Sequence, residues 1–489
     1  MSLKNIIILL VIVALAAILR FYQLGQVPPG LDWDEASLGW NAYSILKTGS
    51  DEYGKPWPVS LQSFSDYKPA LYAYVTIPSV AVFGLNEFAV RFPSALAGLL
   101  TVILTFFLVK ELTNDKLLGY WVTGLLAISP WHLQFSRVAF EANLALFFFV
   151  LGAFFLSRFL HRRSRVALMV SLLAFVLAIY SYHSPRVVIP VFLAGIALYY
   201  RRIFLSHWRL VLVSGLLVLV FLYPLARNTL HTGALSARYQ TVAARLDPQV
   251  LAANYLRHFS LNFLFITGDG QNRHHAPDMG LLYLWELPFL LAGGYFLAVR
   301  RPNWLPFFGV WFLAAPVAAA LANDAPHAVR SLLFLPTFQI VTAYGLIKTL
   351  KTLKILKLLI VFFALGNIFY FLHQYFIHLS VEAAPAWQFG YKQMVKKVLA
   401  IENQYNRIYV TNAYDQPYIY FLFYGRIDPV IKNSGFFYSG FDKYEFSLAK
   451  VDPRGLYVVS PEDRVPGFSA FDQVNFPDGT TAFQLGTIK

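Results

Sequence analysis

The stretch RRSRVALMVSLLAFVLAIYSYHSPRVVIPVFLAGIALYYRR, Arg162–Arg202, decides the fold. It contains two apolar runs, 166–182 and 187–200, which are joined by a short polar turn and end in arginines. Apolar runs of this kind predict helices that enter the hydrocarbon core of a bilayer, which is roughly 30 Å thick. The two runs therefore predict a helical hairpin in a membrane.

The same pattern recurs along most of the 489 residues, of which 57% are hydrophobic and only 13% are charged. A mean hydropathy of +0.53 lies outside the range of soluble domains, so the sequence predicts an integral membrane protein that is mainly α-helical. Eleven membrane helices are predicted, at residues 5–20, 91–110, 117–135, 144–160, 166–182, 187–200, 210–226, 281–299, 304–321, 331–347 and 358–378. The absence of cysteine excludes disulfides, thiolate metal sites and a cysteine nucleophile.

The net charge of +14 is concentrated at one set of helix ends. These ends carry 16 bases: Lys4, Lys110, Lys116, Arg158, Arg162, Arg163, Arg165, Arg201, Arg202, Arg209, Arg300, Arg301, Lys348, Lys351, Lys354 and Lys357. The acids at the same helix ends are only Glu111 and Asp115, so these ends carry a charge of 16 minus 2, which equals the net charge of +14 of the whole chain. The positive-inside rule assigns these ends, and the N-terminus, to the cytoplasm. Nucleic acid is not needed to explain the charge.

The predicted organisation is a transmembrane domain at 1–379, with outer loops at 21–90 and 228–278, followed by a small extracytoplasmic α/β domain at 380–489. That last region has balanced charge and short β-rich runs, RIYV at Arg407–Val410 and LYVV at Leu456–Val459.

Two further helices are predicted in the first outer loop. After Glu35, apolar residues recur at helical spacing and predict an amphipathic helix that lies along the membrane surface. The segment 71–83 is expected to lie flat or to re-enter, because a crossing there would destroy the alternation of charge.

The outer face gathers residues that suit an anionic lipid headgroup. The acids are Asp32, Asp34, Glu35, Asp66, Glu141 and Glu286, and the bases are Lys68, Arg91, Arg137, His183, Arg186, Arg273, His274, His327 and Arg330. The bases are able to hold a phosphate and to stabilise its charge as a leaving group. A facing carboxylate is able to take a proton from an acceptor hydroxyl. The chain contains no Walker loop, GxSxG, HExxH or dinucleotide fingerprint, so nothing indicates a soluble nucleotide donor.

At this point the sequence resembles the membrane glycosyltransferases of the GT-C superfamily, in particular the protein O-mannosyltransferase and aminoarabinose transferase branch. The resemblance covers about residues 1–350. It rests on DWDEASLGWNAYSI (Asp32–Ile45), DYKPALYAY (Asp66–Tyr74), RFPSALAG (Arg91–Gly98), SPWHLQFSRVAFEANLALF (Ser129–Phe147), YSYHSPRVVIP (Tyr180–Pro190), GDGQNRHHAPDMGLLYLWELP (Gly268–Pro288) and HAVRSLLFLP (His327–Pro336).

The resemblance implies a polyprenyl-phosphate sugar as donor, an extracytoplasmic active site and inversion in a single displacement. It implies Asp34 as the catalytic base, with Glu35 orienting the acceptor or Asp34 itself. The family often has Lys-Pro-Pro where this chain has Lys68, Pro69 and Ala70, so the lysine is retained and the loop shape differs. The acceptor is a protein, a lipid or a glycan.

Each candidate also has a structural interpretation. Asp32 or Asp34 would serve as the N-cap of the following helix, with Glu35 in its first turn. Glu141 is either a partner of Arg137 or a second acid that steers sugar or acceptor.

The bases are weighed in the same way. Arg186, Arg330, Lys68 and His183 are expected to bind the donor phosphate, whereas Arg91 is expected to be structural. Arg273, His274 and His327 are assigned to a loop that contacts donor or acceptor.

No metal site is predicted, because His274 and His275 have no carboxylate or third histidine at helical ligand spacing. The sequence leaves open whether a divalent metal ion takes part, and it predicts no other cofactor.

Two other functions are weighed against the glycosyltransferase. A flippase for lipid-linked saccharides would have inverted repeats and charges near the bilayer midplane, and neither is evident in the sequence. A glycan-binding sensor would not need eleven spans.

Overall fold

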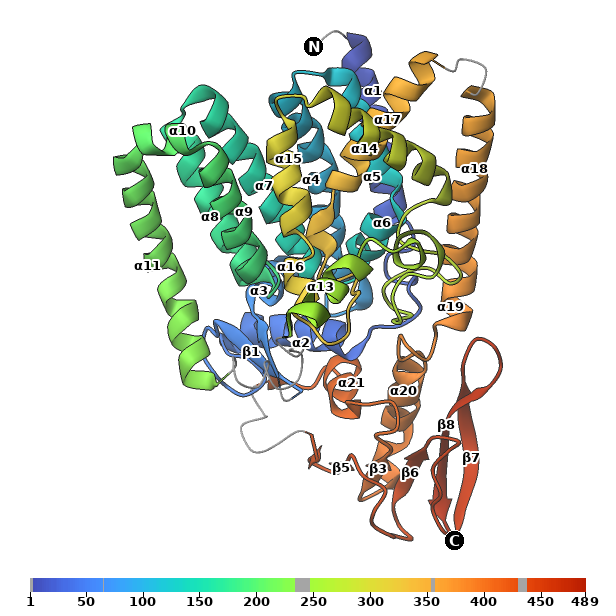
Figure 1. Cartoon of the computed structure of the whole chain (residues 1–489). Coiled ribbons are helices and arrows are strands. Elements are labelled where there is room, and N and C mark those ends of the chain that lie inside the picture. The colour runs from blue at the N-terminus through green and yellow to red at the C-terminus, as the bar shows by residue number, and fades with distance from the viewer. Residues whose placement is uncertain (1–2, 65, 234–246, 353–356, 430–437) are drawn as a thin grey trace. The chain divides into compact units, whose positions relative to one another are not determined.

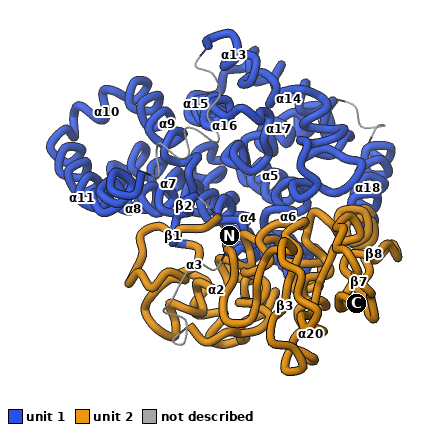
Figure 2. Tube along the Cα trace, turned by 90° about the horizontal axis from the view of Figure 1, so that it is seen from below, with its two compact units in different colours: residues 1–22, 66–71, 94–373 blue, residues 23–65, 72–93, 374–489 orange. Residues whose placement is uncertain are grey.

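The structure is a computed structural model that describes residues 3–64, 66–233, 247–352, 357–429 and 438–489. The chain divides into two compact units, which Figure 2 distinguishes by colour. Unit 1 comprises residues 1–22, 66–71 and 94–373, and unit 2 comprises residues 23–65, 72–93 and 374–489. Most of the first outer loop therefore groups with the C-terminal region. Part of the predicted second outer loop, 234–246, lies outside the described residues.

Unit 1 is a bundle of helices (Figure 1). Its elements are α1 (Leu3–Phe21), strand β2 (Asp66–Pro69), α4 (Glu87–Thr113, in this unit from residue 94), α5 (Lys116–Ile128), α6 (Pro130–Ser136), α7 (Glu141–Arg162), α8 (Arg165–Ser181), α9 (Pro185–Tyr199), α10 (Arg201–Ser206), α11 (Trp208–Thr232), α13 (Pro248–Arg257), η1 (Asn262–Ile266), η2 (Leu284–Glu286), α14 (Leu287–Arg300), α15 (Leu305–Ala314), α16 (Val317–Ala320), η3 (Leu332–Phe334), α17 (Thr337–Thr352) and α18 (Lys357–His373). Helices occupy every predicted span.

Several predicted spans are interrupted helices. The span 117–135 is divided into α5 and α6, because Ser129 leaves the helical conformation and caps α6 with its hydroxyl. Among the described residues, six helical segments are long and apolar enough to cross a bilayer: Leu3–Phe21, Glu87–Thr113, Glu141–Arg162, Trp208–Thr232, Leu332–Leu350 and Lys357–Glu382. The mainly helical membrane fold is confirmed, and the number of crossings remains a prediction.

An aromatic cluster forms part of the core of unit 1. Phe149 of α7 lies with its ring centroid 4.9 Å from that of Trp311 in α15, 5.4 Å from that of Phe175 in α8 and 5.3 Å from that of Phe192 in α9. The indole N–H of Trp311 donates to the carbonyl of Leu333 at 2.6 Å. The buried indole thus has the polar partner that an apolar environment requires.

Unit 2 contains α2 (Trp33–Thr48), β1 (Ser60–Ser63), α3 (Leu71–Phe83, in this unit from residue 72), the first residues of α4, η5 (Gln374–His378), α19 (Leu379–Glu382), α20 (Tyr391–Ile401), η6 (Glu402–Gln404), β3 (Ile408–Val410), α21 (Pro417–Tyr424), β4 (Gly440–Phe441), β5 (Tyr444–Glu445), β6 (Leu456–Val459), β7 (Phe468–Asn475) and β8 (Thr481–Ile488). The predicted helix after Glu35 is α2, and its position along the membrane surface remains a prediction. Ten of its 16 residues are buried, and a side chain at Gly39 would overlap Val90 and Phe423. Protein therefore covers more of α2 than its amphipathic pattern had indicated.

The C-terminal part of unit 2 holds a six-stranded sheet with the order β4-β5-β3-β6-β8-β7. Strand β3 pairs in parallel with β5 and β6, while β8 pairs antiparallel with β6 and β7. The predicted runs RIYV and LYVV supply β3 and β6, the two neighbouring central strands. Their β-branched and aromatic residues fit the buried, pleated surface of a sheet.

The crossing of α14 and α17 depends on the absence of side chains at two glycines. A Cβ atom on Gly293 would overlap the carbonyl oxygen of Val341, and one on Gly345 would overlap that of Phe289. Gly294 meets no atom within 4 Å. Small residues allow such close backbone contact between membrane helices, where apolar side chains gain little from leaving lipid.

We expect Gly293→Ala to destabilise the protein by about 1–3 kcal/mol, since overpacked contacts carry that penalty. Gly294→Ala should be neutral or stabilising by up to about 1 kcal/mol, because alanine is the better helix former. Thermal unfolding of the detergent-solubilised variants measures the difference. Equal midpoints for the two neighbours would contradict the close crossing.

Candidate functional site

The acidic segment 32–35 forms the start of α2. Asp32 is the N-cap, with extended backbone angles (φ −72°, ψ 168°), and its carboxylate accepts a 2.8 Å hydrogen bond from the backbone N–H of Glu35. Asp34 and Glu35 occupy the first turn, where negative charge is stabilised by the helix dipole. At the other end Gly49 adopts the left-handed conformation (φ 72°) and donates its N–H to Ile45. The capping interpretation therefore holds for Asp32.

Glu35 forms a buried, two-pronged ion pair with Arg91 of α4. The Nε of Arg91 lies 2.9 Å from Oε1 of Glu35, and an Nη lies 2.8 Å from Oε2, with both side chains fully buried. The same guanidinium donates to the backbone carbonyls of Leu24, Pro28 and Gly30. Arg91 therefore fixes the segment that leads into α2, which agrees with the structural role expected from the sequence.

Asp34 differs from its two acidic neighbours in its exposure. Asp32 and Glu35 are completely buried, whereas the side chain of Asp34 is only half-buried. Of the three acids, Asp34 is the one that solvent reaches.

The other predicted site residues belong to unit 1. Glu141 is the first residue of α7 and is 8% exposed, and Lys68 lies half-buried on β2. His183 is half-buried in the turn that connects α8 to α9, and Arg186 is half-buried in the first turn of α9. Arg273, also half-buried, accepts a hydrogen bond from Gln134 at its backbone carbonyl.

Arg330 is paired with an acid that the sequence analysis did not consider. Its guanidinium contacts the carboxylate of Asp324, whose other oxygen lies 3.6 Å from Nε2 of His327. Asp324 is 44% exposed and Arg330 is 16% exposed. This ion pair is therefore open to solvent on the side of the acid.

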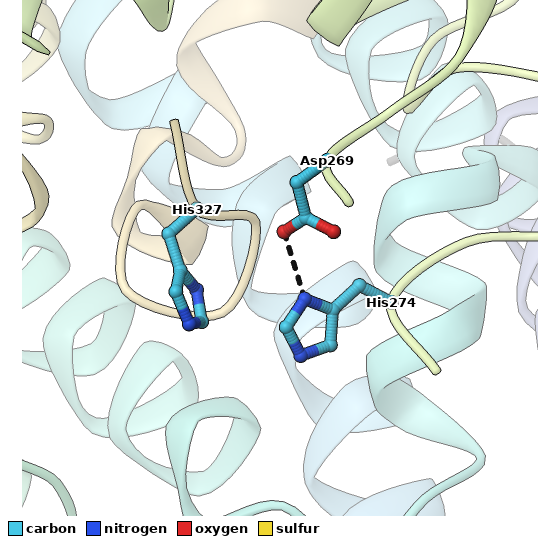
Figure 3. Close-up of side chains that lie close together, drawn as sticks. All are labelled: Asp269, His274 and His327. Carbon is cyan, nitrogen blue, oxygen red and sulfur yellow. Dashed lines mark hydrogen bonds and ion pairs between the residues drawn. The ribbon is translucent and has the colours of Figure 1, made fainter. Parts of the chain in front are cut away.

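Two loops of unit 1 bring His274 and His327 together with Asp269 (Figure 3). Nδ1 of His274 lies 2.7 Å from Oδ2 of Asp269, and the centroids of the two imidazoles are 4.9 Å apart. The three side chains are between 3% and 11% exposed. Asp269 and His274 lie between η1 and η2, whereas His327 lies between α16 and η3.

Burial sets the charge of this cluster. It lowers the pKa of His274, and burial together with nearby His274 and Arg330 lowers the pKa of His327 well below its usual value. Both imidazoles are thus neutral near pH 7. Burial acts to raise the pKa of Asp269, but hydrogen bonds from His274 and from the N–H of Ala328 outweigh it and lower that pKa to about 2.

Asp269 and Asp324 were not among the site residues predicted from the sequence. Asp269 belongs to the sequence GDG, which is typical of a turn, and Gly268 adopts φ +70° there. Asp269 precedes His274 by five residues in a loop, and His327 is more than fifty residues further on. A search for ligands at helical spacing cannot find a cluster that is assembled from two loops. The one sequence signal for this cluster was that an acid, in GDG (268–270), and two histidines, in RHH (273–275), lie close together in the same loop.

Comparisons with known proteins identify the fold. A family model described as dolichyl-phosphate-mannose-protein mannosyltransferase matches residues 10–231. The structure superposes on ArnT from Cupriavidus metallidurans in the apo state with a TM-score of 0.63 and 12% identity, covering 98% of this chain and 97% of that chain. ArnT from the same organism bound to undecaprenyl phosphate gives a TM-score of 0.63 at 13% identity, with 97% of each chain covered. No curated protein sequence matches the chain.

These findings confirm the predicted resemblance to GT-C membrane glycosyltransferases and the predicted fold class. The match to ArnT extends over nearly the whole chain, so the likeness includes the C-terminal region beyond residue 350, where the sequence motifs had ended. The chain therefore has an ArnT-like GT-C fold.

The ion pair of Glu35 and Arg91 yields a stability prediction. Glu35→Gln leaves a buried guanidinium without its counter-charge, and breaking a buried pair in this way destabilises proteins by about 3–5 kcal/mol. Glu111→Gln is the matched control, because its partner Arg162 is 58% exposed and such pairs contribute about 0–1 kcal/mol. Thermal unfolding in detergent compares the two, and equal losses would contradict the assigned role.

Proposed function

We propose that this GT-C-fold membrane protein is a glycosyltransferase that moves a sugar from a polyprenyl-phosphate donor to an acceptor at the extracytoplasmic membrane face. The observation that carries the proposal is the structural match over 97–98% of the chain to ArnT, which includes a form bound to undecaprenyl phosphate. The family model over residues 10–231, whose description names a dolichyl-phosphate sugar, supports the same class of donor.

The catalytic base in this proposal is Asp34. It is the half-buried member of an acidic segment whose other two members are fully buried. Asp34 accepts the proton of the acceptor hydroxyl while the oxygen of that hydroxyl attacks the anomeric carbon. The bond between the anomeric carbon and the phosphate oxygen breaks, and the anomeric configuration inverts. Glu35 is too deeply buried to reach an acceptor, so it acts by holding, with Arg91, the helix turn that carries Asp34.

The donor phosphate is assigned to Lys68, Arg186, Arg330 and His183. Phosphate carries its negative charge away with the leaving group, so nearby cations lower the barrier to breaking the glycosidic bond. Arg330 already holds a carboxylate, that of Asp324. A phosphate oxygen takes the place of this solvent-exposed acid when the donor binds, because guanidinium groups bind both anions by the same forked geometry.

The remaining candidates shape the rest of the site. Glu141, at the N-terminus of α7, steers the sugar or the acceptor. Arg273 and His274, from the loop between η1 and η2, and His327, from the loop between α16 and η3, contact the donor or the acceptor. The proposal covers a protein, a lipid or a glycan as acceptor.

The base is tested with Asp34→Asn, which keeps the size of the side chain and removes the proton acceptor. We expect transfer to fall by about 10²–10⁴-fold, the usual contribution of a general base, while carrier binding stays within a few-fold. Transfer is followed with purified protein and a panel of polyprenyl-phosphate sugars by mass spectrometry of the acceptors.

Asp32→Asn is the control for that experiment. Asparagine caps helices as well as aspartate does, so this variant should keep both its fold and its transfer activity. Full activity in Asp34→Asn, or equal losses in the two variants, would refute Asp34 as the base.

The phosphate-binding role is tested with Arg186→Met. Loss of a charge-assisted hydrogen bond should raise the KM for the donor by roughly tenfold to 100-fold, which corresponds to about 1.5–3 kcal/mol. Arg301→Met removes an arginine from the opposite, predicted cytoplasmic set of helix ends and should leave this KM unchanged. If the two variants give the same KM, Arg186 does not bind the donor.

A further inference from the structure

The Asp269, His274 and His327 cluster has the composition of a metal site. Each side chain offers one ligand atom, and the three atoms lie within 4.8 Å of one another. Figure 3 shows the three side chains converging from separate loop segments. The cluster lies wholly in unit 1, so its geometry does not depend on how the two units are arranged.

The donor set selects a class of ion. Two imidazole nitrogens and one carboxylate oxygen suit Zn²⁺ and its d-block neighbours, whereas Mg²⁺ and Ca²⁺ prefer shells made of oxygen. Three protein ligands around a tetrahedral ion leave one position open, which is the arrangement of catalytic rather than structural zinc sites.

The backbone around the cluster is held in place by hydrogen bonds. The N–H of His327 donates to Nε2 of His258 at 3.2 Å, and the N–H of Ala328 donates to Oδ2 of Asp269 at 2.8 Å. Nε1 of Trp131 donates to the carbonyl of Ala328 at 3.1 Å. Ligands on a backbone fixed in this way lose little conformational entropy when they bind an ion.

Charge around the cluster favours a dication with an anionic fourth ligand. Asp269 contributes one negative charge, and Asp324, beside His327, contributes another that Arg330 balances. A bound dication leaves an excess of one positive charge at the open position. Arg330, which is assigned to the donor phosphate, lies three residues after His327 in the chain.

We propose that Asp269, His274 and His327 bind a Zn²⁺-class divalent ion whose open position takes an oxygen of the donor phosphate. The ion and Arg330 then share the phosphate charge, so the ion adds Lewis-acid stabilisation of the leaving group to that of the arginines. The ion-binding part stands on the geometry of the cluster, and only the phosphate part rests on the proposed function.

Ion binding is tested on tag-free purified protein that has been stripped with a chelator. Calorimetric titration with Zn²⁺ should give one site per chain, and Mg²⁺ should give none. Co²⁺ should bind with the intense visible absorption of a tetrahedral site. Absence of Zn²⁺ and Co²⁺ binding in the wild-type chain would overturn the proposal.

Variants locate the ion. His327→Gln and Asp269→Asn should each lower the Zn²⁺ affinity at least tenfold, since even loss of groups that only support a ligand has effects of about 10–100-fold. His161→Gln, at an exposed histidine in the last turn of α7, should have no effect. Thermal unfolding without metal checks that each variant is folded. Unchanged affinity in both folded cluster variants would overturn the site.

The phosphate contact is tested by adding sugar-free undecaprenyl phosphate to the Co²⁺-loaded protein. A shift of the visible absorption bands is expected in the wild type. The shift should be absent in Arg330→Met, because the arginine and the ion hold the phosphate together. An unchanged spectrum in the wild type would refute the phosphate ligand. Sugar transfer is assayed separately, so a chain that binds the ion but transfers no sugar refutes the proposed function and leaves the metal site standing.

Discussion

The free-energy cost of placing charge in an apolar environment governs this structure. Only 13% of the residues are charged, and those at one set of helix ends account for the whole net charge of +14. The fully buried Arg91 shows how such a charge is stabilised, because it meets Glu35 and three backbone carbonyls within the same unit. An unpaired buried charge of this size would destabilise the fold by several kcal/mol.

In unit 1, buried arginines are stabilised by backbone carbonyls near helix C-termini. Arg20 is fully buried and donates to the carbonyls of Ala16 and Ala127, near the C-termini of α1 and α5, while Arg137 donates to the carbonyls of Leu19 and Arg20. The C-terminus of a helix carries partial negative charge, so these carbonyls stabilise a guanidinium much as an acid does. Buried arginines thereby join α1 to the break between α5 and α6 and fix the segment that leads to Glu141.

The candidate site residues lie at helix starts and in loops, next to buried contacts that fix the backbone. In unit 2 the pair of Glu35 and Arg91 fixes the first turn of α2, and Asp34 on that turn keeps access to solvent. In unit 1 two loops bring Asp269, His274 and His327 together, and their side chains are between 3% and 11% exposed. In both units a framework of buried contacts thus holds the backbone that carries candidate groups.

The helical membrane class, the position of every predicted apolar helix and the central strands β3 and β6 could be predicted from the sequence, because these features follow from local hydropathy and β-propensity. The sequence also indicated most of the candidate side chains, because they are ionisable residues on the predicted outer face. It could not determine the burial of α2, the partner of Arg91 or the cluster that contains Asp269. Those features depend on contacts between segments far apart in the chain: Glu35 lies 56 residues from Arg91, and Asp269 lies 59 residues from Ala328. Pairing over such separations leaves no periodic trace in the sequence, so only the tertiary structure decided which charges meet.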